Sequence, residues 1–244
     1  MKRQGLGAGG WGLGRWIVLG CVTLLGNVGV AAGPQRGGDG GGLRITVRVY
    51  DFAHVPHETL MRAEEEARGI FRKAGLETEW QPCPPNGSLE NPNPVCREVL
   101  GLSGVYVRIV PRSMAARLDS RRDDLGFALG SATPGAATDA WVFYSQIEDL
   151  AARSGAPLAV ILGAAVAHEI GHLLLGLESH SPRGIMRGGW HREDFELAAQ
   201  GGFVFTPEQS EKMRRELTVR SVMKERAGRG AEAPQPATVG EGVN

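Results

Sequence analysis

The segment 157–175 constrains this chain most, because it is apolar nearly all round and yet carries His168, Glu169 and His172. A helix that is apolar on every side is buried, and Gly176 suits the stop of such a helix. A membrane span is disfavoured, since the three polar residues interrupt the segment and no companion span accompanies it. The sequence therefore predicts a buried core helix that carries the chemistry of the protein.

The spacing of the polar residues in this helix indicates a metal site. His168 and His172 are four residues apart, so on a helix they project from one side and their ring nitrogens can converge. Glu169 lies at the edge of that face, where its carboxylate can hold a metal-bound water as general base. The sequence predicts a Zn²⁺ site with His168 and His172 as ligands and Glu169 as the catalytic residue.

The run 168–180 resembles the metzincin metallopeptidases, whose pattern is HExxHxxGxxH. The resemblance implies that Gly176 ends the helix and that the chain doubles back to deliver His180 as the third zinc ligand. Gly184-Ile185-Met186 resembles the Met-turn of that family, whose methionine lies beneath the metal as an apolar floor. Each of the two spacings around Gly176 is four residues here, where the family has three.

This departure leaves alternatives for the third ligand. Glu178 occupies the position of the family's third histidine, and a carboxylate also binds zinc. Glu193 or Asp194 could serve instead, as distal acids do in other HExxH peptidases. His191 has no metal-ligand spacing, but its place in the sequence makes its distance from the cleft worth determining.

Hydrophobic periodicity predicts five strands and three principal helices. The strands are expected over 43–52, 76–81, 105–110, 125–129 and 140–144, and the helices over 57–74, over 157–175 and from 206 onward. The resemblance implies an α+β fold, in which a metzincin-like twisted mixed β-sheet packs on the active-site helix and a small C-terminal helical subdomain follows. By the same analogy, Gly126–Gly130 is a candidate edge strand for binding peptide substrates, with an interior strand as the open alternative.

Two local details refine this expectation. Thr206 and Gln209 match a capping box, which would open the last helix. Gly171 lies inside the active-site helix, where glycine costs about 1 kcal/mol against alanine, so it indicates close packing at that point.

The N-terminal residues are typical of an export signal, with Lys2 and Arg3 before an apolar stretch and small residues at 30–32 for cleavage. We expect a secreted or periplasmic protein with no stable membrane insertion after cleavage. The expected organisation is a signal peptide over 1–32, a Gly-rich leader over 33–42, a catalytic domain over 43–220 and a disordered tail over 221–244.

Charge and cysteine content limit the partners. The 27 Lys and Arg residues balance 27 Asp and Glu residues, and no basic run indicates a nucleic-acid groove. Cys83 and Cys96 remain after signal removal, and an even pair in an oxidising compartment favours a disulfide, with a zinc-capping thiol as the alternative. We expect a monomer that acts on a peptide or protein substrate.

Two other functions stay open at this point. One is a catalytically inactive zinc-binding surface module, and the other is a zinc hydrolase of a non-peptide amide. Glu169 favours an enzyme over the first of these, because a structural zinc site needs no base and usually closes with a fourth protein ligand.

Overall fold

The computed structural model describes residues 42–85, 93–118, 124–130 and 138–231. The predicted signal peptide and nearly all of the Gly-rich leader lie outside the described residues.

A five-stranded mixed sheet forms one layer of the domain, with the strand order β2-β1-β3-β5-β4. The strands are β1 (Arg44–Asp51), β2 (Glu77–Cys83), β3 (Gly104–Val110), β4 (Gly126–Leu129) and β5 (Thr138–Phe143). The first four strands in this order run parallel, whereas β4 pairs antiparallel with β5. All five strands lie where the alternation of apolar residues predicts them, and β4 takes the edge position that the sequence left undecided.

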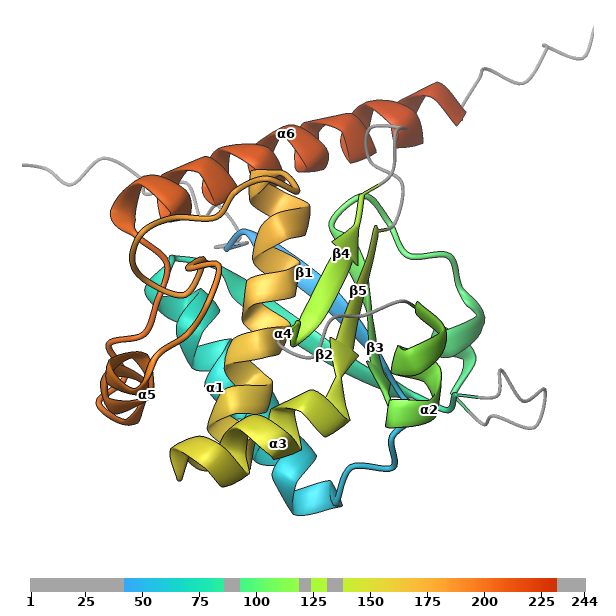
Figure 1. The fold of residues 1–244 in the computed structure, drawn as a ribbon. Helices are drawn as coiled ribbons and strands as arrows, with labels where there is room; N and C mark the ends of the chain where they lie inside the picture. Colours follow the sequence, from blue (N-terminus) through green and yellow to red (C-terminus); the bar gives the residue numbers. More distant parts are fainter. Residues whose placement is uncertain (1–41, 86–92, 119–123, 131–137, 232–244) are drawn as a thin grey trace, which may run out of the picture. The chain divides into compact units, whose positions relative to one another are not determined.

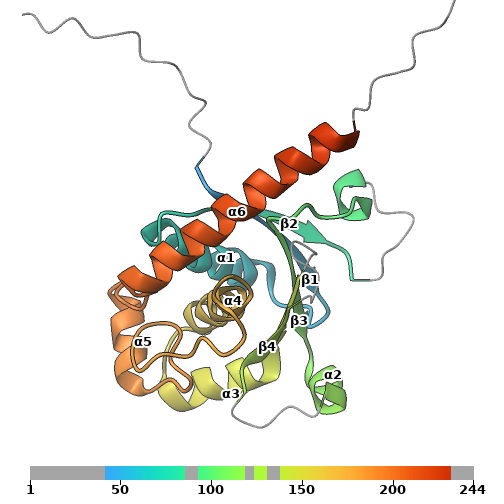
Figure 2. The ribbon, with the colours of Figure 1, turned by 90° about the horizontal axis from the view of Figure 1, so that it is seen from above.

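The helices gather mainly on one face of this sheet. They are α1 (His57–Lys73), α2 (Arg112–Ala115), α3 (Tyr144–Ser154), α4 (Leu158–Leu175), α5 (Arg192–Ala199) and α6 (Pro207–Ala231). Figure 2 shows α1, α3, α4 and α5 on one side of the sheet and the short α2 on the other. The sequence predicts α1, α4 and α6, whereas α2, α3 and α5 were not anticipated.

The core lies between the sheet and α4. Every second residue of β1 faces it, and Ile45, Val47 and Val49 are at most 3% exposed. Gly163 lets α1 approach α4 closely, because a Cβ atom there would lie 2.5 Å from the backbone oxygen of Ala63. Figure 1 shows α4 running through the middle of the domain, between α1 and the strands β4 and β5.

α4 is also the one helix among the described residues that is long and apolar enough to cross a membrane. In this structure 83% of its 18-residue window is buried inside the domain. Its apolar sequence is therefore accounted for by the core that surrounds it, as expected for a buried helix.

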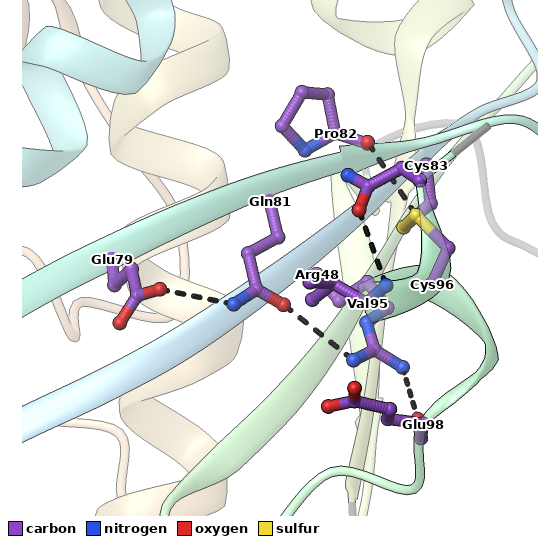
Figure 3. Close-up of a disulfide and its surroundings, with 9 residues drawn as sticks. Arg48, Glu79, Gln81, Pro82, Cys83, Val95, Cys96 and Glu98 are labelled. Carbon is purple, nitrogen blue, oxygen red and sulfur yellow. Dashed lines mark hydrogen bonds between the residues drawn. A yellow bond between two sulfur atoms is a disulfide. The ribbon is translucent and has the colours of Figure 1, made fainter.

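The sheet face away from α4 carries a disulfide at the end of β2. Figure 3 shows Cys83 joined to Cys96, which lies in a short 3₁₀ helix over Pro94–Arg97. Beside it, Arg48 of β1 is 2% exposed and donates to the backbone oxygen of Glu98 over 2.6 Å. The buried guanidinium and the disulfide together hold Pro94–Glu98 against the sheet, with the cysteine pairing that the sequence predicts.

The last helix begins as predicted and ends later than expected. The Thr206 amide donates to Gln209 Oε1 over 2.9 Å and the Gln209 amide to Thr206 Oγ1 over 3.3 Å, which confirms the capping box. α6 then continues to Ala231, past residue 220, where we expected the disordered tail to begin. Lys224, Glu225 and Arg226 have a high intrinsic helix propensity, which favours continuation of a helix that is already formed.

Candidate metal centre

The turn at the end of α4 brings the following residues back towards His168 and His172. The helix ends at Leu175, and Gly176 follows with φ at +105°, a conformation that L side chains rarely adopt. The chain therefore leaves the helix axis at this glycine and turns back, as the sequence predicts. Ser179 and His180 follow on the returning segment.

Three histidines meet at this turn. The candidate ligand nitrogens of His168, His172 and His180 all lie within 4.8 Å of one another, and the first two side chains are buried while His180 is exposed. The Nε2 atoms of His168 and His172 are 3.0 Å apart. Nitrogens bound to one tetrahedral zinc ion at about 2.0–2.1 Å lie roughly 3.3 Å from each other, so this separation fits a shared ion.

The opposite ring nitrogens of the helical histidines are held by hydrogen bonds. His168 Nδ1 lies 2.7 Å from the backbone oxygen of Ile185, which can only accept, so this nitrogen carries the proton. The Ser179 hydroxyl lies 3.2 Å from His172 Nδ1. The contact at His168 fixes the tautomer that leaves Nε2 free to bind a metal, and both contacts orient the rings.

Burial keeps these rings in the metal-binding form. It lowers the pKa of His168 to about 4, with neighbouring His172 and His180 acting in the same direction and the Ile185 carbonyl opposing them. Burial likewise lowers the pKa of His172, again assisted by His180. Both imidazoles are therefore neutral at pH 7, and neutral imidazole is the form that coordinates metals.

Glu169 lies between α4 and β4 with one carboxylate oxygen unpaired. The residue is 5% exposed, and burial raises its pKa to about 8, with Asp124 adding to the effect. Its Oε2 atom is buried without a hydrogen-bond partner, while a Cβ atom on Gly126 would lie 2.8 Å from Oε1. An unpaired buried acceptor beside three imidazole nitrogens is the arrangement that a zinc ion with its water would complete.

Met186 packs under the same part of the helix. It is fully buried, and a Cβ atom on Gly171 would lie 2.6 Å from its Sδ atom and 2.8 Å from Phe205 Cε1. The missing side chain at Gly171 thus admits both residues against the turn that separates His168 from His172. The close packing that the helical glycine indicates is confirmed.

The alternative third ligands lie elsewhere. Glu178 and Glu193 are exposed and do not belong to the histidine group. Asp194 is 5% exposed, but its Oδ2 atom accepts from the His191 backbone amide over 2.8 Å. His191 itself is the exposed N-cap of α5 and does not line the cleft.

A cavity of about 290 Å³ opens beside the histidines and Glu169. One part of its wall is β4 and the residue before it, and another is the segment after Met186. The lining includes Asp124, Leu125, Gly126, Phe127, Ala128, Leu177, Arg187, Gly188, Gly189 and Trp190. The sequence offers one signal for part of this wall, namely that Arg187 follows the predicted Met-turn directly.

Comparisons with known proteins add two structural neighbours. No family model and no curated protein matches the chain. A zinc-dependent peptidase from Methanocorpusculum labreanum is 16% identical, covers 68% of this chain and 99% of its own, and has a TM-score of 0.40. An archaemetzincin from Methanopyrus kandleri is 13% identical, covers 72% of this chain and 97% of its own, and has a TM-score of 0.41.

Proposed function

We propose that this protein is an exported zinc-dependent metallopeptidase, with His168, His172 and His180 as the metal ligands and Glu169 as the general base. The observation that carries the proposal is the meeting of three imidazoles with a buried carboxylate on one open cavity. A structural zinc site is usually closed by four protein ligands, whereas three ligands leave a position for water. His180 is exposed, so this open position is reachable from solvent.

The chain's own residues account for the proton transfers of amide hydrolysis. Bound zinc supplies Lewis acidity, which acidifies water and polarises a carbonyl oxygen. The positive charge of a bound zinc ion would oppose the burial that raises the pKa of Glu169 and would favour its ionised form. The Glu169 carboxylate then accepts a proton from the attacking water while the water oxygen bonds to the carbonyl carbon. The same carboxyl then gives that proton to the amide nitrogen as the carbon–nitrogen bond breaks.

The edge strand supports a peptide as the substrate. β4 pairs with β5 along one side only, in the sheet order of the described residues, and its residues line the cavity next to Glu169. An extended peptide that adds to such an edge forms main-chain hydrogen bonds whatever its sequence. We propose that substrates bind along Gly126–Leu129, with the scissile bond over the histidines.

The test is cleavage of a diverse peptide library by the zinc-loaded protein and by its Glu169→Gln variant. We expect the variant to lose at least about 10²-fold in kcat/KM, because general-base catalysis contributes roughly 10²–10⁴-fold, while zinc content measured by elemental analysis stays at the wild-type level. Glu178→Gln is the matched control: this exposed carboxylate lies on the turn beside the histidines and its loss should change neither quantity.

The same measurements separate the alternatives. His180→Ala should lower zinc content, whereas Glu178→Ala should not; the reverse result would make Glu178 the ligand. Bound zinc without cleavage of any peptide would favour the inactive binding module. Turnover of simple amides in the absence of peptide cleavage would favour the non-peptide hydrolase.

Export is part of this proposal and is supported by the disulfide at the end of β2. Cys83 and Cys96 form a bond that persists in oxidising compartments and is rare in the cytosol of mesophiles. Mass spectrometry of protein recovered from outside the cytoplasm should show a chain that begins near residue 33. Recovery of full-length protein from the cytoplasm alone would contradict export.

A further inference from the structure

Arg187 is the one lysine or arginine among the described residues that line the cavity. The other charged side chains of that wall are Asp124 and Glu169, and most of the remaining lining is apolar or glycine. Arg187 is therefore the lysine or arginine of this wall that could attract an anionic group of a bound molecule.

The position of Arg187 is fixed on both sides. The preceding residue, Met186, is locked beneath α4 against Gly171. The Arg187 backbone amide donates to the Gly184 oxygen over 3.1 Å, which closes the turn. On the other side, a Cβ atom on Gly188 would lie 3.3 Å from His180 Nδ1, so the chain after Arg187 runs against a proposed ligand.

The guanidinium keeps most of its donors available. Its described contact is one N–H group, Nη1, that lies 3.4 Å from Asp194 Oδ2, which is long for a hydrogen bond between charged groups. The side chain remains 35% exposed. Arginine presents five donors in a planar fork that matches a carboxylate, so one long contact leaves the fork free to bind a second partner.

The residues after Arg187 also line the cavity, so a second partner of its guanidinium would be part of a bound substrate. Gly188 and Gly189 follow directly and line the cavity next to Arg187, and neither has a side chain that could fill the space beside it. Trp190 then closes this wall, with its ring 5.7 Å from that of His168.

We propose that Arg187 binds a carboxylate of the substrate and makes the enzyme selective for peptides that carry one near the cleaved bond. This inference rests on the proposed function. The carboxylate is either the free C-terminus of a short peptide or an Asp or Glu side chain. In both cases a charge-assisted pair forms within a cleft whose wall holds the guanidinium in place.

A purely structural role for Arg187 predicts something different. In that case the residue would serve only to tie the turn at 184–187 to α5 through Asp194, and its loss would affect all substrates alike. Asp194→Asn separates the two roles, because it removes the charge of the structural partner and leaves the guanidinium in the cavity.

Four peptides of equal length test the proposal: one with a free C-terminus, its C-terminal amide, and two amides with either Glu or Gln at one internal position. Their kcat/KM values are measured with the zinc-loaded protein, and their Kd values by calorimetry with zinc-loaded Glu169→Gln protein. Further pairs of amidated peptides carry the Glu or Gln at other positions along the chain. Melting temperatures of all variants report folding.

We expect Arg187→Gln to reduce kcat/KM and binding about tenfold or more for a carboxylate peptide, since a hydrogen bond to a charged group is lost, and to leave the neutral peptides little changed. Arg187→Lys should recover part of the loss, because lysine keeps the charge but not the fork. Asp194→Asn should retain the preference. Arg192→Gln, which removes an exposed cation of α5, should also retain it.

The outcomes are distinguishable. If Arg187→Gln lowers kcat/KM and binding only for the peptide with a free C-terminus, or only for the peptide with an internal Glu, the result identifies the source of the carboxylate. Equal losses on charged and neutral peptides, or binding that never improves with a carboxylate, overturn the inference. Cleavage without carboxylate preference would leave the proposed function standing, whereas carboxylate-dependent binding without any cleavage would remove that function and keep the Arg187 site.

Discussion

At the scale of single residues, two groups outside the proposed ligand set contact the histidines of α4. Ile185 and Ser179 each contact the Nδ1 atom of a helical histidine, over 2.7 Å and 3.2 Å. A ligand whose far nitrogen is held loses less rotational freedom when it binds metal. The backbone contact cannot be removed by a side-chain change, but the hydroxyl contact can.

Ser179→Ala therefore tests this support. We expect the dissociation constant for zinc to rise about tenfold, at the lower end of the 10–100-fold range known for such partners, because Ser179 is only partly buried. Competition with a chromogenic chelator measures it. Ser154→Ala removes a hydroxyl that bonds the Leu150 carbonyl at the end of α3 and serves as the control. An unchanged zinc affinity in Ser179→Ala would mean that Ser179 does not support His172, whose ring also interacts with the backbone at Gly176 and Leu177.

How far single residues could be predicted depends on where their contacts come from. His168, Glu169 and His172 follow from helical spacing alone, because one turn of helix brings them together. The structure brings His180 to them, although that residue was named only through a resemblance. Ser179 carries no signal in the sequence, and Arg187 is marked only by its place after the predicted Met-turn, since the contacts of both residues exist only after the chain has turned back at Gly176.

At the scale of elements, α6 holds the end of α4. Lys212 Nζ donates to the Leu175 oxygen over 2.5 Å, and Arg220 Nη2 donates to the Leu173 oxygen over 2.9 Å. The last carbonyls of a helix lack partners within the helix and carry partial negative charge, so cations there are stabilising. These contacts hold the last turn of α4, directly after His172.

Arg220→Met should lower the free energy of unfolding by about 1.5–3 kcal/mol, the range for a hydrogen bond to a charged group. Methionine keeps the packing of the aliphatic stem and removes the donors. Urea unfolding of the metal-free protein measures the change. Arg215→Met is the matched control on the same helix, because that side chain is 65% exposed and its surface pair with Glu211 contributes little. Equal effects of the two substitutions would argue against the role of α6 in holding α4.

The elements that the sequence did not reveal lack ordinary start signals. α3 follows β5 without a loop, and its N-cap, Phe143, makes no capping hydrogen bond with its side chain. α5 spans only eight residues, too few for a clear helical period, and its capping box pairs Asp194 with His191, which is not among the residues preferred at the N-cap. By contrast, α6 opens with Thr206 and Gln209, a preferred capping pair, and the strands either alternate in hydrophobicity or form short apolar runs between turn residues, so these elements were predictable.

At the scale of the whole molecule, the proposed zinc ion would join parts that the chain supplies separately. Two ligands come from α4 and the third from the turn after it, while Glu169 packs against Gly126 of the edge strand. The order of the strands could not be predicted, because periodicity shows which face of a strand is buried but not which strand lies beside it. The resemblance named Gly126–Gly130 as a candidate edge strand, but only the fold decided between an edge and an interior position.

Metal removal should therefore destabilise the entire domain. Free zinc at about 100 times its dissociation constant is expected to add about 2.7 kcal/mol to the free energy of unfolding, provided that the unfolded chain does not bind it. Thermal unfolding with zinc and with a chelator measures the shift. His191→Ala, a surface histidine, should keep the shift, and His180→Ala should lose most of it. A shift of equal size in both variants would mean that zinc stabilises the protein from another site.

Lys212 and Arg220, which bind the last carbonyls of α4, lie 37 and 47 residues after the residues that they contact. A chain that is made, or threaded through a membrane, from its N-terminus presents the metal ligands well before Lys212 and Arg220 emerge. A growing chain thus lacks the last supports of its reactive centre until its final long helix is available. Such an order of appearance would delay hydrolysis until synthesis or transit of the domain is nearly complete.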